Sequence, residues 1–277
     1  MKLQNNPFFI LGLPCSAGRR EIVAAAEELS FLLDADTCSS AQNELINLNK
    51  RLSAELGWFL DAEKEDIQTI QDAVNNNGQI SIDGLSSLSK LNATLYNFSI
   101  SQEEDTYELG YSILDIDEQY SALDYAEIAD EVNRNRTAAK IAGVQENDIS
   151  EELNRKRNDI RQAISDRLAN LDQDTYVELI TMLAEKCIAD DEYEDGVILS
   201  DVVDQYEVRM QAQLEESTER IESHIGHIQH LANDEAIGDN IKSLIRQVQK
   251  WDKIAQPLQL KSQASGMLVL LLPLGSR

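Results

Sequence analysis

Apolar residues recur at helical spacing along almost the whole chain. One stripe joins positions 22, 26, 29 and 33, and a second joins positions 45, 48, 52, 56 and 59. Residues at these spacings lie on one face of an α-helix, so residues 6–61 are predicted to hold a short apolar segment and two helices that face each other. No strand-like alternation runs for long, and only 4 prolines and 12 glycines interrupt the pattern. We therefore predict an all-α fold.

The longer helices are predicted in the second half of the chain. Residues 75–84 (NNNGQISIDG) form a turn-rich break, and a helix is expected over 85–100. Two long periodic stretches, 146–189 and 197–232, are predicted to form an antiparallel pair. The expected organisation is a small helical module (1–75), an acidic helical region (76–145), a bundle of long helices with coiled-coil-like packing (146–262) and a tail (263–277).

The last predicted helix carries the most regular pattern. Its apolar positions step alternately by four and three residues, through Ile237, Ile241, Leu244, Val248, Trp251, Ala255 and Leu258. This spacing is a heptad seam and requires a partner helix, in the same chain or in a homo-oligomer. The same segment is basic, with Lys242, Arg246, Lys250, Lys253 and Lys261. We expect it to pack on an acidic face of its own chain or of another. The segment MLVLLLPLGSR leaves the heptad pattern, and we assign the tail no function.

The net negative charge of the chain limits the kinds of molecule that it is expected to bind. The chain has 50 acidic and 24 basic residues and a formal charge of −26, which repels nucleic acid and anionic lipid. Residues 101–131 contain many carboxylates and several tyrosines but no Lys or Arg. Such a run is typical of a solvated helix face with an aromatic core edge, and alternatively of a docking site for a basic partner. A protein partner with a basic surface is therefore expected.

Targeting signals and cysteine chemistry are not indicated. The apolar run from Phe8 to Leu13 is too short for a secretion signal, and MLVLLLPL is too short to span a bilayer. We expect a cytoplasmic protein with no membrane partner. The three cysteines, Cys15, Cys38 and Cys187, have no CxxC spacing, so neither a disulfide framework nor a zinc site is predicted.

The histidines are the main candidates for metal chemistry. All three occur in HIGHIQH, and His224 and His227 lie close enough on one helix to share a metal ion. The alternatives are structural histidines beside an isoleucine seam and a cluster that senses pH. Neither a catalytic triad, nor a glycine-rich phosphate loop, nor a complete calcium loop can be built from the sequence. We expect no enzymatic activity and no cofactor.

The first quarter of the chain resembles a known module. Phe8-Phe9-Ile10-Leu11-Gly12-Leu13 is similar to the opening helix and turn of a J-domain, the module by which Hsp40-type co-chaperones stimulate the ATPase of Hsp70. The segment from Glu21-Ile22 to Leu29 resembles the second helix of that family. The segment from Leu45 to Leu60-Asp61 resembles its third helix. The resemblance implies a J-like helical hairpin within residues 1–75.

The resemblance also identifies a missing motif. The loop that carries His-Pro-Asp in the family falls here on Asp34, Ala35 and Asp36, so only the aspartate is kept. The family's second helix presents Lys and Arg to Hsp70, whereas here it carries Glu21, Glu27 and Glu28. The resemblance therefore implies a non-catalytic adaptor or co-chaperone that binds an Hsp70-type chaperone or a client complex without stimulating ATP hydrolysis. The alternative function is a coiled-coil oligomerisation scaffold.

Overall fold

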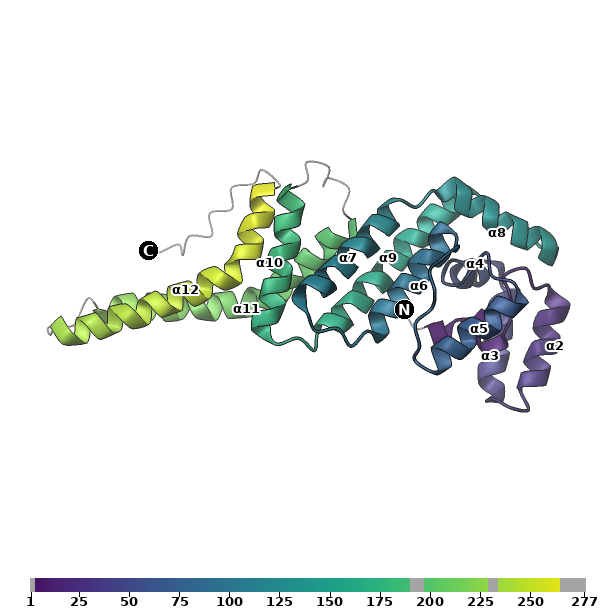
Figure 1. Ribbon diagram of the computed structural model, residues 1–277, viewed down its shortest axis with the longest axis horizontal. Helices are drawn as coiled ribbons and strands as arrows, with labels where there is room; N and C mark the ends of the chain where they lie inside the picture. Colours follow the sequence, from purple (N-terminus) through teal and green to yellow (C-terminus); the bar gives the residue numbers. More distant parts are fainter. Residues whose placement is uncertain (1–2, 190–196, 229–233, 265–277) are drawn as a thin grey trace. The chain divides into compact units, whose positions relative to one another are not determined.

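The protein is built from helices throughout its described part. The computed structural model describes residues 3–189, 197–228 and 234–264, which contain twelve α-helices and one short 3-10 helix and no strand (Figure 1). The predicted all-α class is confirmed. None of the described helices is both long enough and apolar enough to cross a membrane.

The chain forms two compact units. Unit 1 combines Met1–Gln102 with Asp115–Arg167, and unit 2 combines Glu103–Leu114 with Leu168–Arg277. Unit 1 contains, in chain order, η1 (Leu3–Asn5), α1 (Pro7–Leu11), α2 (Arg19–Leu29), α3 (Ala35–Ile46), α4 (Leu48–Leu56), α5 (Lys64–Asn75), α6 (Ser87–Ile100), the second half of α7 (Thr106–Ser121), α8 (Tyr125–Ala139) and nearly all of α9 (Glu146–Leu168). The predicted helix over 85–100 corresponds to α6.

The second N-terminal helix differs from its prediction. A single helix was expected through positions 45 to 59, but the chain breaks at Asn47 and forms α3 and α4. Asn47 has an extended backbone, and its side-chain oxygen accepts hydrogen bonds from the amides of Asn49 and Lys50. An asparagine in this role starts a new helix and fixes its direction. Helix α5 was not predicted at all.

The C-terminal end of α4 is the best-connected point of unit 1. Helix ends leave backbone carbonyls without partners, and asparagines from three other elements satisfy them here. Asn6 donates to the carbonyls of Ala54 and Gly57 at 2.9 and 3.0 Å, Asn92 donates to those of Leu56 and Trp58 at 3.2 and 2.8 Å, and Asn135 donates to that of Leu60 at 2.8 Å. The end of α4 is thereby tied to the residue before α1, to α6 and to α8.

A buried ion triad adds a second tie at the same place. Glu55 accepts from Nε of Arg51 at 2.8 Å and from Nε and Nη2 of Arg136 at 2.9 Å. All three side chains are almost inaccessible to solvent. Further guanidinium hydrogens reach backbone carbonyls: Nη2 of Arg51 donates to Cys15 and Ala17, and Nη1 and Nη2 of Arg136 donate to Ala142 and Leu48.

These ties explain why the units differ from the predicted ranges. Residues 1–75 do not form a compact unit of their own, because α8 and α9 belong to the same unit as α1 to α6. Glu55 and Arg136 are separated by 81 positions in the sequence. The compact units therefore do not follow the predicted divisions after residues 75, 145 and 262.

Unit 2 is formed around the last three helices, α10 (Gln173–Ala189), α11 (Val197–Ile228) and α12 (Asp234–Ala264). Helix α12 packs on both α10 and α11. The hydroxyl of Tyr206 donates to the carbonyl of Ile254 at 2.7 Å, and Ile254 and Ala255 are buried. The helix pair predicted from residues 146–189 and 197–232 thus gives way to a group in which α12 is the main partner of both α10 and α11.

The basic residues of α12 behave partly as expected. Lys253 pairs with Asp174 of α10 at 2.9 Å, and Lys261 pairs with Asp204 of α11. The prediction that this segment packs on an acidic face of its own chain is confirmed for these two lysines. The heptad seam is covered only near its C-terminal end, because Ala255 is buried while Ile241 and Val248 are exposed. Coiled-coil packing along the whole seam stays a prediction.

The ion triad generates a stability prediction. Glu55→Gln leaves two buried guanidinium groups without their carboxylate and is expected to lower the free energy of unfolding of unit 1 by about 3–5 kcal/mol. The variant is best measured in a Trp251→Phe background, where the buried Trp58 reports on unit 1 during urea denaturation. Glu27→Gln, at an exposed position of α2, is the control and should change stability by less than about 0.5 kcal/mol. Equal effects of the two substitutions would contradict the structural role of the triad.

Candidate functional site

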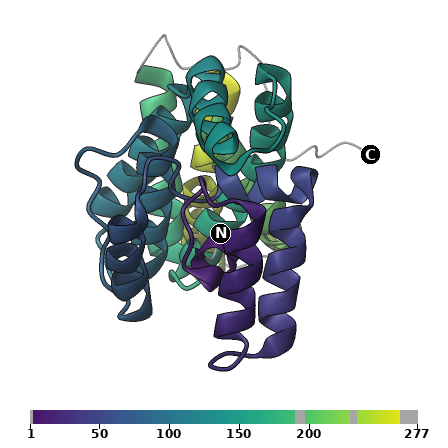
Figure 2. The ribbon, with the colours of Figure 1, turned by 90° about the vertical axis from the view of Figure 1, so that its right-hand side faces the viewer.

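The turn between α2 and α3 lies at the free end of a helical hairpin. Figure 2 shows the two helices side by side and joined by this turn. The inner face of the hairpin contains Ile22, Ala26, Cys38, Ala41 and Leu45, which are all buried. Burial of these residues fixes the hairpin and leaves the turn, residues 30–34, projecting into solvent.

The segment Asp34-Ala35-Asp36 lies where this turn enters α3. Asp34 is the N-cap of α3, and Ala35 and Asp36 occupy its first turn. The Asp34 carboxylate accepts from the backbone amide and the hydroxyl of Thr37, both at 2.8 Å. These two hydrogen bonds lower the pKa of Asp34 from its ordinary 3.8, and the bond from the hydroxyl has the larger effect. Asp34 therefore starts the helix.

Three consecutive large apolar side chains form the tip of the turn. Phe31 is 88% exposed, Leu32 79% and Leu33 49%. Leu33 was predicted to belong to the buried stripe of the first helix, but α2 ends at Leu29 and Leu33 points out of the hairpin. Isolated exposed apolar residues are ordinary, whereas a contiguous apolar cluster on a projecting turn marks an interaction site. We call Phe31, Leu32 and Leu33 the apolar tip.

Acidic groups flank the apolar tip. Glu27 and Glu28 precede it on α2, and Asp34 and Asp36 follow it, and all four are exposed. No Lys or Arg occurs between Glu21 and Asn49. The hairpin end therefore combines an apolar centre with a negative surround, which disfavours contact with anionic membranes and favours a partner with a basic rim.

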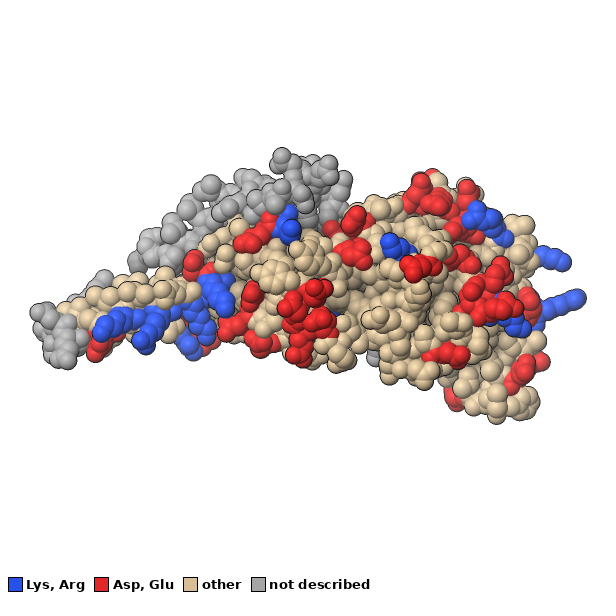
Figure 3. Space-filling view, viewed as in Figure 1, with Lys and Arg blue, Asp and Glu red and all other residues tan. Residues whose placement is uncertain are grey.

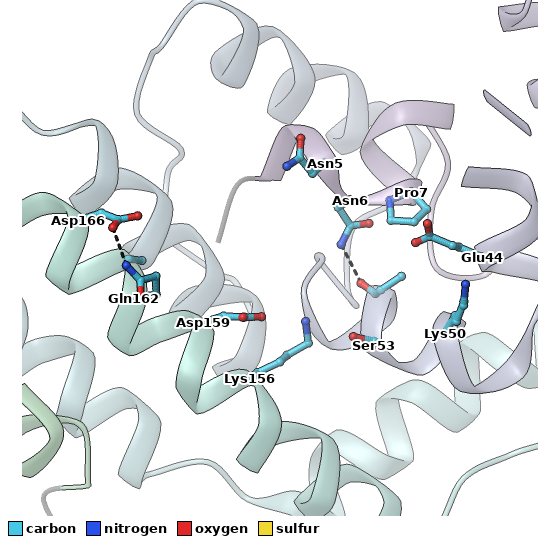
Figure 4. Close-up of a pocket in the computed structure, with 12 residues that line it drawn as sticks. Asn5, Asn6, Pro7, Glu44, Lys50, Ser53, Lys156, Asp159, Gln162 and Asp166 are labelled. Atoms are coloured by element: carbon cyan, nitrogen blue, oxygen red, sulfur yellow. Dashed lines mark hydrogen bonds between the residues drawn. The ribbon is translucent and has the colours of Figure 1, made fainter. Parts of the chain in front are cut away.

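A cavity in unit 1 is the second candidate site. It has a volume of about 560 Å³ and is lined by Asn5, Asn6, Pro7, Glu44, Lys50, Ser53, Ala54, Lys156, Asp159, Gln162, Ala163 and Asp166. Figure 4 shows the Lys156 side chain pointing into it between Asp159 and Ser53. Burial lowers the pKa of Lys156, and the carboxylates of Asp159 and Glu152 oppose this shift.

The chemistry of this cavity is that of a polar hollow. Its lining has two ammonium groups and three carboxylates, so it attracts neither anions nor cations strongly. Ser53 supplies the one hydroxyl of the lining, with no imidazole or thiol beside it to act as a base. Cys15 does not line this cavity. Burial is the main cause that raises the pKa of its thiol well above the ordinary value, and the nearby Glu55 carboxylate raises this pKa further. The cavity offers hydrogen-bonding groups, and its lining contains neither histidine nor cysteine.

The histidines do not come together with other metal ligands. His224 is half-buried and His227 is exposed on α11, while His230 lies outside the described residues. Within the described ranges no group of three or more His, Cys, Asp or Glu side chains is placed to hold a metal ion. The isoleucine seam beside them is only partly buried, since Ile221 is buried and Ile225 exposed.

The acidic run follows the periodicity of a solvated helix. On α7, Leu109, Ile113 and Ile116 are buried, while Tyr107 and Tyr111 are exposed. In the aromatic core edge predicted for this run, Tyr120 is buried and Tyr125 is half-buried. Tyr107 and Tyr111 are four residues apart on α7 and lie on the same helix face. They are a pair, whereas the apolar tip has three consecutive large apolar side chains.

Neither protein-family models, nor curated protein sequences, nor solved structures gave a match to this chain. The apolar tip is the feature that sequence reasoning missed. Its signal was the run Phe31-Leu32-Leu33 directly before a good N-cap residue, in which Phe31 and Leu32 fall outside the preceding stripe.

The cap of α3 has a testable pH dependence. The pKa of Asp34 is lowered in the folded state, so its stabilising hydrogen bonds are complete above about pH 3.8 and are lost as the pH falls through the lower folded value. The protection factors of the amides at the start of α3, which are exchange rates corrected for the intrinsic effect of pH, should therefore fall on acidification in the native protein. Asp34→Asn keeps an accepting oxygen and should remove this pH dependence, whereas Asp36→Asn should retain it. Retention in both variants would show that Asp34 is not the cap.

Proposed function

We propose that this protein is a non-catalytic, J-domain-like adaptor that binds a protein partner through the end of the α2–α3 hairpin. The observation that carries the proposal is the apolar tip. It projects from two packed helices directly before Asp34, where a J-domain has its His-Pro-Asp loop. A projecting apolar cluster held on a rigid hairpin provides contact area at little cost in conformational entropy.

The surroundings of the tip support binding without stimulation of ATP hydrolysis. In the resembled family the tripeptide engages Hsp70, and Asp34-Ala35-Asp36 lacks its His and Pro. The Asp34 carboxylate is also already occupied by Thr37. Helix α2 begins with Arg19 and Arg20 but presents glutamates toward the tip. A contact that needs a basic second helix cannot be repeated with this charge.

The same features define the chemistry of the partner. An apolar tip of one aromatic and two leucine side chains fits an apolar groove of a folded protein. The acidic surround requires Lys or Arg at the rim of that groove, which also accelerates encounter at low ionic strength. An Hsp70-type chaperone, or a client complex that contains one, is the partner class that the J-like hairpin favours.

Binding to a purified Hsp70-type chaperone tests this proposal. The intact protein should bind in a surface-immobilised assay, and binding should weaken as salt rises. Substitution of two tip residues, Phe31→Ser with Leu32→Ser, should weaken binding by about thirtyfold or more, as expected for central apolar anchors. Ile82→Ser changes an exposed apolar residue elsewhere in unit 1 and is the matched control, which should bind like the native protein.

The second readout is catalytic. In single-turnover ATP hydrolysis, the chaperone rate should stay unchanged when the native protein is added at saturating concentration. A clear stimulation of this rate would contradict an adaptor that lacks the tripeptide activity. Equal binding by the tip variant and by the Ile82→Ser control would show that the contact lies elsewhere on the surface.

A further inference from the structure

The free end of the α11–α12 hairpin carries an apolar face that stays exposed among the described residues 3–189, 197–228 and 234–264. Helices α11 and α12 run in opposite directions, and a hydrogen bond of 3.1 Å from Nε1 of Trp251 to the hydroxyl of Thr218 fixes their register (Figure 1). Beyond this bond, residues 219–228 of α11 lie beside 237–250 of α12. Ile225, Ile241, Ile245 and Val248 are each between 43% and 51% exposed there.

These side chains lie on one side of the hairpin. At about 100° per residue, Ile241, Ile245 and Val248 fall within about 60° of one another, next to the surface that α12 turns toward α11. Ile225 occupies the corresponding shoulder of α11. A pair of helices can cover only the apolar surface between them, whereas a four-helix arrangement also covers a second face. This apolar shoulder therefore lacks the layer that would bury it.

The two helices of the hairpin carry charges of opposite sign beside the apolar face. Beyond Ile225, the adjoining surface of α11 carries exposed Glu215, Glu219 and Glu222. On α12, Lys242 lies about 60° beyond Ile245 and begins a row of exposed basic residues at successive helical turns, Lys242, Arg246 and Lys250. Figure 3 shows basic side chains gathered along this hairpin. Lys242 pairs only within α12, with Asp239 at 3.3 Å. Each helix thus has the same order of apolar and then charged residues, with opposite sign.

We infer that this face binds a second copy of the same chain. A two-fold axis along the hairpin places α12 of one copy on α11 of the other, so that basic residues meet acidic residues on both sides of a shared apolar core. A two-fold axis across the hairpin would place α11 on α11 and oppose like charges. The self-complementary charge pattern therefore selects both the partner and the symmetry, and the product is a four-helix bundle. This inference is independent of the apolar tip on the α2–α3 hairpin.

The mass of the full chain in solution tests the inference. Sedimentation equilibrium should give a species of twice 31.1 kDa that dissociates on dilution and weakens at high salt. Ile241→Ser with Ile245→Ser should weaken the dimer by about tenfold or more, since each dimer loses four apolar contacts. Val208→Ser is the matched control, because Val208 is an exposed apolar residue of α11 outside this face. Circular dichroism should show the same helical content for both.

Charge reversal separates this dimer from other associations. Lys242→Glu, Arg246→Glu and Lys250→Glu in one chain, and Glu215→Lys, Glu219→Lys and Glu222→Lys in another, should each give a monomer. An equimolar mixture of the two variants should form a heterodimer, because each α12 then faces an α11 of opposite charge. A native chain that stays monomeric, a dimer that survives the isoleucine substitutions, or reversed chains that fail to pair on mixing would each overturn the inference.

Discussion

The buried carboxylate of Glu55 organises the N-terminal half of the protein. Two guanidinium groups, one from the same helix and one from α8, converge on it in a place that water cannot reach. Burial of three charges is stabilising only when each charge is paired and its remaining hydrogens are satisfied, and backbone carbonyls complete this requirement here. The arrangement makes α1 to α4 part of a larger unit that also includes α8 and α9. It also supplies a firm base for the α2–α3 hairpin, whose far end is free.

The sequence predicted the elements better than their partners. Helical periodicity was sufficient to predict the all-α class, because a helix that buries one face has apolar residues at regular intervals along the sequence. The pairing of Glu55 with Arg136 could not be predicted from spacing. Arg51 and Glu55, at i and i+4, have the spacing of an ordinary surface pair, so nothing in the sequence indicates that Glu55 is buried with a second arginine. The break at Asn47 was missed because the apolar spacing continues across it. There the side-chain cap overrides the periodicity.

The candidate site was only half predicted. The position of the altered J-like loop followed from counting along the resemblance, and Asp34, Ala35 and Asp36 do lie where the turn enters α3. The exposure of Phe31, Leu32 and Leu33 could not be predicted in the same way, because Leu33 continues the stripe of Leu29 and exposure depends on where α2 stops. For the last helix the heptad seam predicted a partner for its whole length, whereas α10 and α11 cover mainly its C-terminal half.

We propose separate binding roles for the two exposed apolar features. One is a compact tip with an acidic surround, suited to a groove on a different protein, and the other is a face whose charges match a second copy of itself. Hydrogen–deuterium exchange of the intact protein, with and without a purified Hsp70-type chaperone, tests the central claim most directly. The account predicts slower exchange confined to residues 29–38 around the apolar tip when the chaperone is bound. Unchanged exchange in this segment, with protection elsewhere or nowhere, would contradict it.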